Sequence, residues 1–225
     1  EEGIAKLHNS KVIVFGIGGV GSFVVEALTR AGVGNLILVD NDTICISNIN
    51  RQIHARQSTV GMIKVEAMKE RVISINPNCN VEAKQVFITA DNISEIIPSD
   101  VDYVVDAIDT VTSKLALAEY CYKNNINIIS SMGTGNKIDP TQFRVSDVFK
   151  TKVCPLAKVM RYELRKRGVK KLKVVYSEEM PMTPDKGRAV PSQKRQTPGS
   201  ISFVPPVAGM IIGGEVIKDL TGLNK

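Results

Sequence analysis

Short apolar runs alternate along this chain with longer segments in which apolar residues recur at helical spacing. The apolar runs predict strands at Val12–Phe15, Leu36–Asp40, Tyr103–Asp106 and Asn127–Ser131. The periodic segments predict helices at Ser22–Ala31, Val60–Ile75 and Thr112–Asn124, and Pro77 stops the second of these. Strands that alternate with helices favour parallel pairing with right-handed crossovers. The pattern therefore predicts an α/β fold, in which helices flank a doubly wound, mainly parallel sheet.

A glycine-rich turn joins the first predicted strand to the first predicted helix. It reads Gly16-Ile17-Gly18-Gly19-Val20-Gly21. Glycines here let the backbone approach a phosphate, and the N-terminus of the following helix directs its free N–H groups at that phosphate. Asp40 ends the next apolar run, where an acid that binds a ribose belongs. These features predict a nucleotide site in a Rossmann-like fold, and alone they suit an NAD- or FAD-dependent oxidoreductase.

Polar residues after Asp40 favour the cleavage of ATP instead. They are Asp42, Asn48, Arg51, Gln52, Lys64 and, after the third predicted strand, Asp109. Negative charge develops on the phosphates as the bond between the α- and β-phosphates breaks, and fixed cations and a carboxylate-held magnesium stabilise it. Because ligands of such sheets lie beyond the carboxyl ends of the strands, we expect Gly16–Gly21, Asp40 and Asp106–Asp109 to meet at one cleft.

These motifs, taken together over residues 12–135, resemble those of the ubiquitin-activating-like (ThiF-type) adenylyltransferase superfamily. The resemblance implies ATP and Mg²⁺ as cofactors, with Arg51, Lys64 and Asp109 as catalytic residues and Asp109 as the magnesium ligand. It further implies that Gly16, Gly18, Gly19 and Gly21 shape the phosphate loop, that Asp40 holds the ribose, and that Asn48, Arg51 and Lys64 contact the phosphates. Asp42 and Gln52 are expected to lie beside these phosphate-contacting residues.

Length and composition limit the number of domains and the class of protein. At 225 residues and 24.5 kDa, with 43% hydrophobic residues, the chain suits one domain, with a nucleotide-binding core at 1–135 and a substrate-binding extension at 136–225. The sequence lacks an apolar stretch of the roughly 20 residues that a membrane span needs, and no basic-then-apolar leader opens it. We therefore expect a cytoplasmic protein that has no membrane partner.

The cysteines are too far apart for the pairs of a zinc site. Cys45, Cys79, Cys121 and Cys154 form no C-x-x-C motif, so we expect no zinc. Cys154 precedes Pro155, near the place where thioester-forming members of the superfamily carry their cysteine, but a buried structural thiol is the favoured interpretation. His54 is interpreted as a capping or packing residue.

The C-terminal part resembles one branch of the superfamily, the tRNA threonylcarbamoyladenosine dehydratases. The likeness lies in the segments 138–145, 150–152, 155–158 and 172–177, and in a glycine-spaced helix at Pro206–Leu220. It implies that ATP adenylates the threonyl carboxylate of a modified adenosine next to the anticodon of tRNA. The neighbouring carbamoyl group then closes a ring and expels AMP.

Positive charge is concentrated in the same part of the chain. Lys150–Lys173 holds ten Lys or Arg and one acid, Glu163, which gives a local charge of +9 in a chain whose net charge is +6. Such a basic C-terminal extension is typical of a surface that binds a phosphate backbone, although a solvated helix face over Pro155–Arg167 is a competing interpretation. The expected tRNA-binding residues are Lys152, Lys158, Arg161, Arg165, Lys166, Arg167, Lys170 and Lys171. Residues 177–200 are predicted to form a mobile loop, either a lid over RNA or ordinary disorder.

Partners and alternatives follow from the same resemblance. Family members are homodimers in which an N-terminal arginine reaches the partner's ATP site. This sequence has no arginine before Arg30, which leaves that role to residues upstream of Glu1 or to none.

The alternative function is an adenylyltransferase that activates the C-terminus of a ubiquitin-like sulfur carrier protein, with that carrier or a sulfur-transfer protein as its partner. A nicotinamide-dependent oxidoreductase and a nucleotide-gated tRNA-binding module are further alternatives. The basic segment and the missing cysteine pairs favour tRNA.

Overall fold

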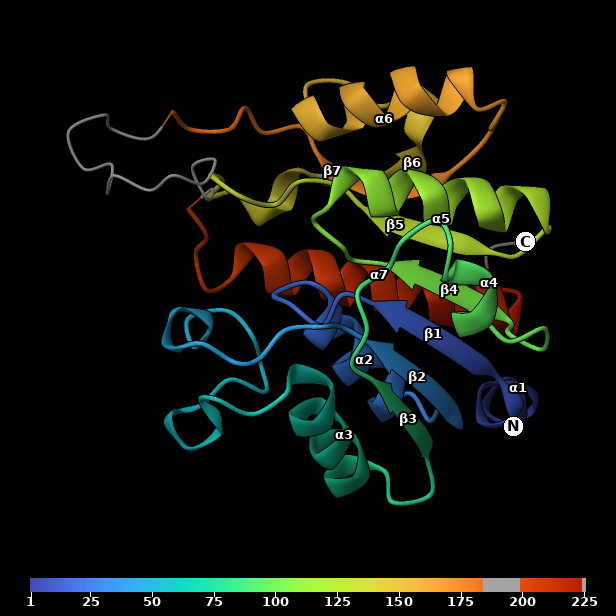
Figure 1. Cartoon of the computed structure of the whole chain (residues 1–225), viewed down its shortest axis with the longest axis vertical. Helices are drawn as coiled ribbons and strands as arrows, with labels where there is room; N and C mark the ends of the chain where they lie inside the picture. The colour runs from blue at the N-terminus through green and yellow to red at the C-terminus, as the bar shows by residue number, and fades with distance from the viewer. Residues whose placement is uncertain (184–198, 224–225) are drawn as a thin grey trace.

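Seven strands form one sheet through the middle of the molecule (Figure 1). The structure is a computed structural model and describes residues 1–183 and 199–223. The strands are β1 Lys11–Phe15, β2 Asn35–Val39, β3 Asn80–Lys84, β4 Tyr103–Asp106, β5 Ile128–Ser131, β6 Phe143–Asp147 and β7 Lys173–Ser177, in the order β3-β2-β1-β4-β5-β7-β6. Most of the predicted mobile loop, residues 184–198, lies outside the described residues.

The sheet is mostly parallel. Every neighbouring pair of strands is parallel except β6 and β7, which pair antiparallel at one edge. The prediction of a doubly wound, mainly parallel sheet is therefore confirmed. The sequence pattern missed β3, β6 and β7. The edge strands β3 and β6 each have one fully buried residue, so no apolar run marks them, whereas β7 is a buried run that the pattern left unassigned.

Helices cover both faces of the sheet. The longer helices are α1 Glu2–Asn9, α2 Gly21–Arg30, α3 Lys64–Ile75, α5 Val111–Lys123, α6 Pro155–Lys166 and α7 Val204–Thr221, and α4 is the single turn Ile93–Ile96. Leu7, Val24, Met68 and Ile212, from α1, α2, α3 and α7, share one buried cluster with the strands. Residues of α4, α5 and α6 pack on the opposite face. The result is three layers, with α5 in front of the sheet and α7 behind it (Figure 1).

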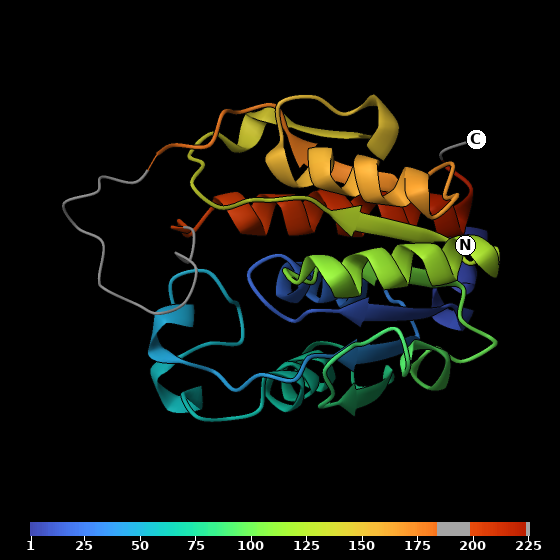
Figure 2. The same ribbon diagram turned by 45° about the horizontal axis from the view of Figure 1, so that its top comes forward.

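Single turns of 3-10 helix occur in the connections between these elements. They are η1 Ile46–Asn48, η2 Gln57–Thr59, η3 Pro140–Gln142 and η4 Val148–Lys150. The segments around η1 and η2 connect β2 to α3 and lie at the same end of the molecule as the start of α7 (Figure 2). Several chain segments therefore gather at the carboxyl ends of the central strands.

One predicted helix begins later than its spacing indicated. The sequence pattern predicted a helix from Val60, whereas α3 begins at Lys64. Gly61 has a φ of +91°, and its N–H donates to the carbonyl of Ile44, so these residues form a turn that packs on the preceding loop. The difference moves Lys64 from inside the helix to its first position.

None of the helices among residues 1–183 and 199–223 is long and apolar enough to cross a membrane.

Candidate active site

A cavity of about 450 Å³ lies at the carboxyl ends of β1, β2 and β4. This volume falls in the range of small-ligand sites, roughly 300–1,000 Å³. The residues predicted to bind the nucleotide line it, with the single exception of Gly21: Gly16, Gly18, Gly19, Asp40, Asp42, Asn48, Arg51, Gln52, Lys64 and Asp109. The structure therefore brings together residues from four separate stretches of the sequence.

Close backbone packing explains the glycines of the turn. Gly16 has a φ of +86°, and a Cβ there would lie 2.6 Å from the carbonyl oxygen of Ala107. A Cβ on Gly21 would lie 1.8 Å from the carbonyl oxygen of Gly16, so Gly21 supports the turn from beneath rather than facing the cavity. Gly19 faces Arg51, whose Cγ would lie 3.1 Å from an added Cβ. The turn can hold this shape only without side chains at Gly16 and Gly21.

Asp40 is bound to the turn by backbone hydrogen bonds. Its Oδ2 accepts from the N–H of Ile17 at 2.7 Å, and its Oδ1 accepts from the N–H of Asp42 at 2.9 Å. Burial raises the pKa of Asp40, and the charge of Lys64 and these N–H groups oppose that rise. Each carboxylate oxygen can accept a further hydrogen bond, so the group can still receive a ribose hydroxyl.

Lys64 is the buried cation of the cavity. Its Nζ lies 2.7 Å from Oδ2 of Asp42 and 4.0 Å from Oδ1 of Asp40. Asp42 is the exposed member of the pair, whereas only 7% of the Lys64 side chain is exposed. The ammonium is therefore held at the wall of the cavity by carboxylates on the chain segment that follows β2.

Arg51 and Gln52 come from the loop after η1. The Nη1 of Arg51 donates to the carbonyl of Ser47 at 3.0 Å and to Oδ1 of Asn50 at 3.1 Å, which leaves further guanidinium N–H groups to donate. Gln52 is 4% exposed, and its Oε1 has no hydrogen-bond partner within the described residues. An unpartnered buried oxygen beside the glycine turn fits a site that a ligand completes.

Asn48 and Asp109 contribute polar atoms on two sides of the cavity. Oδ1 of Asn48 accepts from the N–H of Cys45 at 2.9 Å. This hydrogen bond fixes the carboxamide and leaves its Nδ2 as a donor. Asp109 is exposed, and its Oδ1 accepts only a long 3.4 Å bond from the hydroxyl of Thr110 in the described part of the chain. Its carboxylate can therefore accept a further donor or a cation.

A buried ion pair positions the loop that carries Asp109, and sequence reasoning missed it. Asp106 and Lys114 are both fully buried, with 2.9 Å between Nζ and Oδ2. Lys114 also donates to the carbonyl of Ile108 at 3.2 Å, and Ser130 donates to Asp106 at 2.5 Å. A lysine on the apolar face of the predicted helix at 112–124 was the available signal. Asp106 therefore anchors the loop that carries Asp109.

Further cavity residues had no motif to mark them. Val86, Phe87 and Ile88 follow β3, and Thr134, Ser200 and Pro205 come from the C-terminal half. They are found only once the sheet order places β3 beside β2 and the start of α7 beside the glycine turn.

The residues predicted to bind tRNA lie apart from this cavity, on and around α6. Lys152, Lys158, Arg165, Lys166, Arg167, Lys170 and Lys171 are exposed. Arg161 differs from them, because its Nη1 donates to the carbonyl of Thr151 at 3.0 Å and ties α6 to the preceding turn. Arg165 lies over the ring of Phe149, and Arg167 pairs with Glu119 at 2.8 Å.

His54 and three of the four cysteines are buried in the protein interior. Cys45 is exposed, and Cys79, Cys121 and Cys154 are buried. Cys154 stands directly before the first residue of α6, Pro155, and is 2% exposed. His54 is 3% exposed, and burial lowers its pKa to about 4. Its two ring nitrogens have no partner within the described residues.

Comparison with known proteins extends over the whole chain. The model of the ThiF family matches residues 1–225. A tRNA threonylcarbamoyladenosine dehydratase of Bacillus subtilis is 46% identical over 98% of this chain and 90% of that protein. The crystal structure of the E. coli tRNA N6-threonylcarbamoyladenosine dehydratase in complex with AMP is 36% identical, with a TM-score of 0.90, over 100% of this chain and 91% of that one. The same E. coli protein in complex with ATP is 35% identical, with a TM-score of 0.89.

Proposed function

Because this chain belongs to the ThiF family, we propose that it is an ATP-dependent tRNA threonylcarbamoyladenosine dehydratase, which forms the cyclic modified base. The observation that carries the proposal is that its likeness to the Bacillus subtilis enzyme covers 98% of the chain, so it includes the part beyond the nucleotide cavity. A likeness limited to the nucleotide-binding core would not separate this branch from the activators of carrier proteins.

The cavity fits ATP. Its glycine turn leaves room for phosphates, Arg51 and Lys64 supply positive charge, and the unpartnered Oε1 of Gln52 can accept from a bound ligand. Asp40 faces the turn from the end of β2 and would hold the ribose. The nucleotide therefore lies across the ends of β1 and β2, with its phosphates towards Arg51.

Two cations act on the phosphates as the bond between the α- and β-phosphates breaks. The threonyl carboxylate attacks the α-phosphate and gives an acyl-adenylate and pyrophosphate. Lys64 and Arg51 stabilise the charge that moves to the departing pyrophosphate, and Asn48 donates to a phosphate oxygen. Because Asp42 and Asp40 already hold Lys64, its ammonium needs little reorganisation when that charge develops.

Asp109 is the residue that would hold Mg²⁺. Its exposed carboxylate has one weak partner in the described chain, and Mg²⁺ commonly binds one or two carboxylates together with substrate phosphates. When bound, the ion would neutralise phosphate charge.

Ring closure needs no nucleophile from the enzyme. The carbamoyl group attacks the activated carbonyl carbon and releases its N–H proton to solvent. The bond between this carbon and the oxygen that bridges to phosphorus breaks, and AMP leaves with that oxygen. Both reacting groups belong to the same modified base, so proximity lowers the barrier. The burial of Cys154 agrees with a structural role for this thiol.

The tRNA binds over α6 and the segment that follows it, where the exposed basic residues cluster. The protein acts in the cytoplasm as a homodimer. Met210 of α7 is 49% exposed, and Val207, Ile211 and Ile217 are half-buried against the core, so the apolar residues that α7 leaves partly uncovered offer an interface.

Pyrophosphate release measured with different acceptors tests the proposal. The parent chain is incubated with ATP and either tRNA that carries threonylcarbamoyladenosine, the same tRNA without the modification, or a ubiquitin-like sulfur carrier protein. Release that requires the modified tRNA supports the dehydratase. Release with the carrier protein and not with modified tRNA would replace it with the alternative function.

A further inference from the structure

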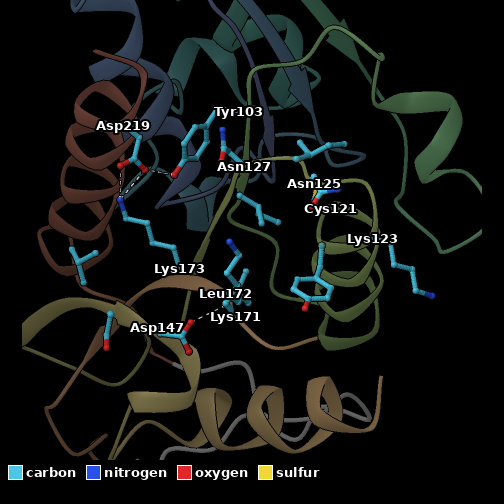
Figure 3. A pocket seen from close by; sticks show the side chains of 15 residues that line it. Tyr103, Cys121, Lys123, Asn125, Asn127, Asp147, Lys171, Leu172, Lys173 and Asp219 are labelled. Atoms are coloured by element: carbon cyan, nitrogen blue, oxygen red, sulfur yellow. Dashed lines mark hydrogen bonds and ion pairs between the residues drawn. The ribbon is translucent and has the colours of Figure 1, made fainter. Parts of the chain in front are cut away.

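A second cavity lies at the opposite end of the sheet from the nucleotide cavity. It measures about 970 Å³ and is bounded by the amino ends of β4, β5 and β7, the carboxyl end of β6 and the C-terminal turns of α5 and α7. Figure 3 shows Tyr103, Asn127, Asp147, Lys173 and Asp219 around it. We refer to it as the amino-end cavity.

Its acidic groups are already satisfied within the protein. Asp147 accepts from the N–H of Phe149 at 2.8 Å and from that of Leu172 at 3.2 Å. Asp219 accepts from the hydroxyl of Tyr103 at 2.6 Å and from Lys173 at 2.8 Å, as the dashed lines in Figure 3 indicate. These carboxylates therefore have little capacity left to attract a cation.

The groups that remain free are donors. Lys171, Asn125 and Asn127 are exposed, and their side chains make no hydrogen bond or ion pair within the described residues. Tyr122 adds a half-buried aromatic ring to the lining. A cation, two carboxamides and an aromatic ring favour a ligand that combines negative charge with a planar group. The size of the cavity suits a nucleotide better than a lone phosphate.

The surroundings connect this cavity to the tRNA surface. The basic run of α6 continues through Lys166, Arg167 and Lys170 into Lys171, which lines the cavity, and these side chains are exposed. The strands between the two cavities have four or five residues, so at about 3.3 Å per residue the cavities are roughly 13–17 Å apart. About five nucleotide steps of a helical strand cover that distance.

We propose that the amino-end cavity binds a nucleoside phosphate of the tRNA, away from the base that reacts. Lys171 holds the phosphate, Asn125 and Asn127 donate to the phosphate or the base, and Tyr122 stacks on the base. The inference rests on the proposed function, because it takes tRNA as the substrate. The second contact would fix the orientation of the tRNA while the reacting base lies in the nucleotide cavity.

A charge-matched pair of double variants tests the site. Lys171→Gln/Asn127→Ala removes two cavity donors. Lys6→Gln/Asn78→Ala removes the same charge and one exposed carboxamide at positions outside both the cavity and the basic surface of α6. We expect the first to weaken tRNA binding about tenfold and the second about twofold, because a charge-assisted contact contributes more than a screened surface charge. Unfolding temperatures of the two variants report whether the fold is intact, and equal losses of affinity would overturn the proposal.

A positional readout separates tRNA from a free nucleotide. In a Cys45→Ser background, Asn127→Cys labelled with a photoreactive group should cross-link to tRNA, whereas Asn78→Cys should not. Cytidine monophosphate is titrated in parallel at saturating ATP, which occupies the other cavity. Tight binding of the mononucleotide with no cross-link to tRNA would overturn the proposal in favour of a free ligand. If the parent chain itself fails to cyclise modified tRNA, the proposed function fails, and the cross-link still reports on the cavity independently.

Discussion

The charged residues of the nucleotide cavity differ in how much of their bonding capacity the protein uses. Asp40 and Lys64 are held by partners within the chain. Among the described residues, Asp109 accepts one long hydrogen bond, and Arg51 donates through Nη1 alone. Groups that are already held form the wall of the site. Those with free capacity respond directly to the ligand.

We expect Asp109→Ala and Arg51→Ala each to lower ATP–pyrophosphate exchange by at least about 100-fold, the scale for the loss of one contact to the charge of the transition state. ATP should still bind, because the glycine turn and Asp40 remain. Asp91→Ala and Arg56→Ala make the same chemical changes at exposed positions outside the cavity and should leave exchange unchanged. Near-normal exchange in the first two variants would refute the site.

Lys64→Ala should lower turnover more than it weakens the binding of ATP. An interaction that strengthens only as the phosphate bond breaks adds to the rate and little to the affinity of the ground state. Exchange rates and ATP dissociation constants of parent and variant give the two effects. Equal losses in both would show that Lys64 is a simple binding residue.

The burial of His54 predicts a pH dependence of stability. Its pKa falls from 6.5 to about 4 in the folded chain, so the unfolded chain binds a proton first as the pH falls. The free energy of unfolding should therefore decrease between about pH 6.5 and pH 4, by on the order of 3 kcal/mol for this group. His54→Phe should remove that part of the slope in denaturant titrations, whereas the exposed His8→Asn should retain it. An unchanged slope in His54→Phe would contradict this interpretation.

Residue types and spacing were enough to predict the charged side chains and the glycines that line the nucleotide cavity, because the ends of parallel strands meet at one edge. They were not enough to predict how the site is held. The pairs Asp106–Lys114 and Asp42–Lys64 depend on which helix packs beside which strand. Phe87 and Ser200 likewise enter the cavity only through the order of the strands and the path of the chain to α7.

Helix α7 packs closely on α2. A Cβ on Gly213 would lie 2.6 Å from the Cβ of Ala27 in α2, whereas a Cβ on Gly214 would have no atom within 4 Å. We expect Gly213→Ala to destabilise the fold by about 1–3 kcal/mol, since α2 must move. Gly214→Ala should be neutral or stabilising by up to about 1 kcal/mol, because alanine favours the helix. Denaturant unfolding of the two variants checks this, and equal effects would show that α7 does not need the close approach.

The basic surface of α6 predicts a salt-dependent effect on tRNA. Lys158, Arg165 and Lys166 are exposed, and replacing all three with Gln should weaken tRNA binding and lower its salt slope by about three, one for each lost phosphate contact. Arg161 stays in place because its bond to Thr151 supports the fold. The control is a second triple variant that makes the same change in net charge outside α6, with Gln at Lys6, Arg30 and Arg56. Filter binding over a salt series gives the slopes, and identical slopes for the two triple variants would contradict a localised tRNA surface.

Apolar periodicity predicted β1, β2, β4, β5, α2 and α5 because these elements are buried, but it left the equally buried β7 unassigned. It failed at Val60–Ile63, where a glycine turn continues the helical spacing without the helix, and at the edge strand β3, where polar residues alternate with apolar ones. It also treated Arg161 as one more basic residue of a helix face. Only the packing of α6 on the preceding turn distinguishes that arginine from its neighbours.

For the whole molecule, the sheet separates two cavities that α7 spans. Pro205 near the start of α7 lines the nucleotide cavity, and Asp219 near its end lines the amino-end cavity. The basic residues of α6 continue into Lys171, which lines the amino-end cavity. A substrate as long as tRNA can contact all three regions at once, which a small acid or a nicotinamide substrate cannot do.

Mass analysis of the modified nucleoside tests the central claim most directly. Modified tRNA is incubated with the parent chain and ATP and digested to nucleosides, and AMP and pyrophosphate are measured in the same samples. The proposed function predicts that threonylcarbamoyladenosine loses one water, in step with the AMP formed, and that Asp109→Ala prevents both. An unchanged nucleoside mass after incubation with an ATP-binding, folded parent chain would contradict it.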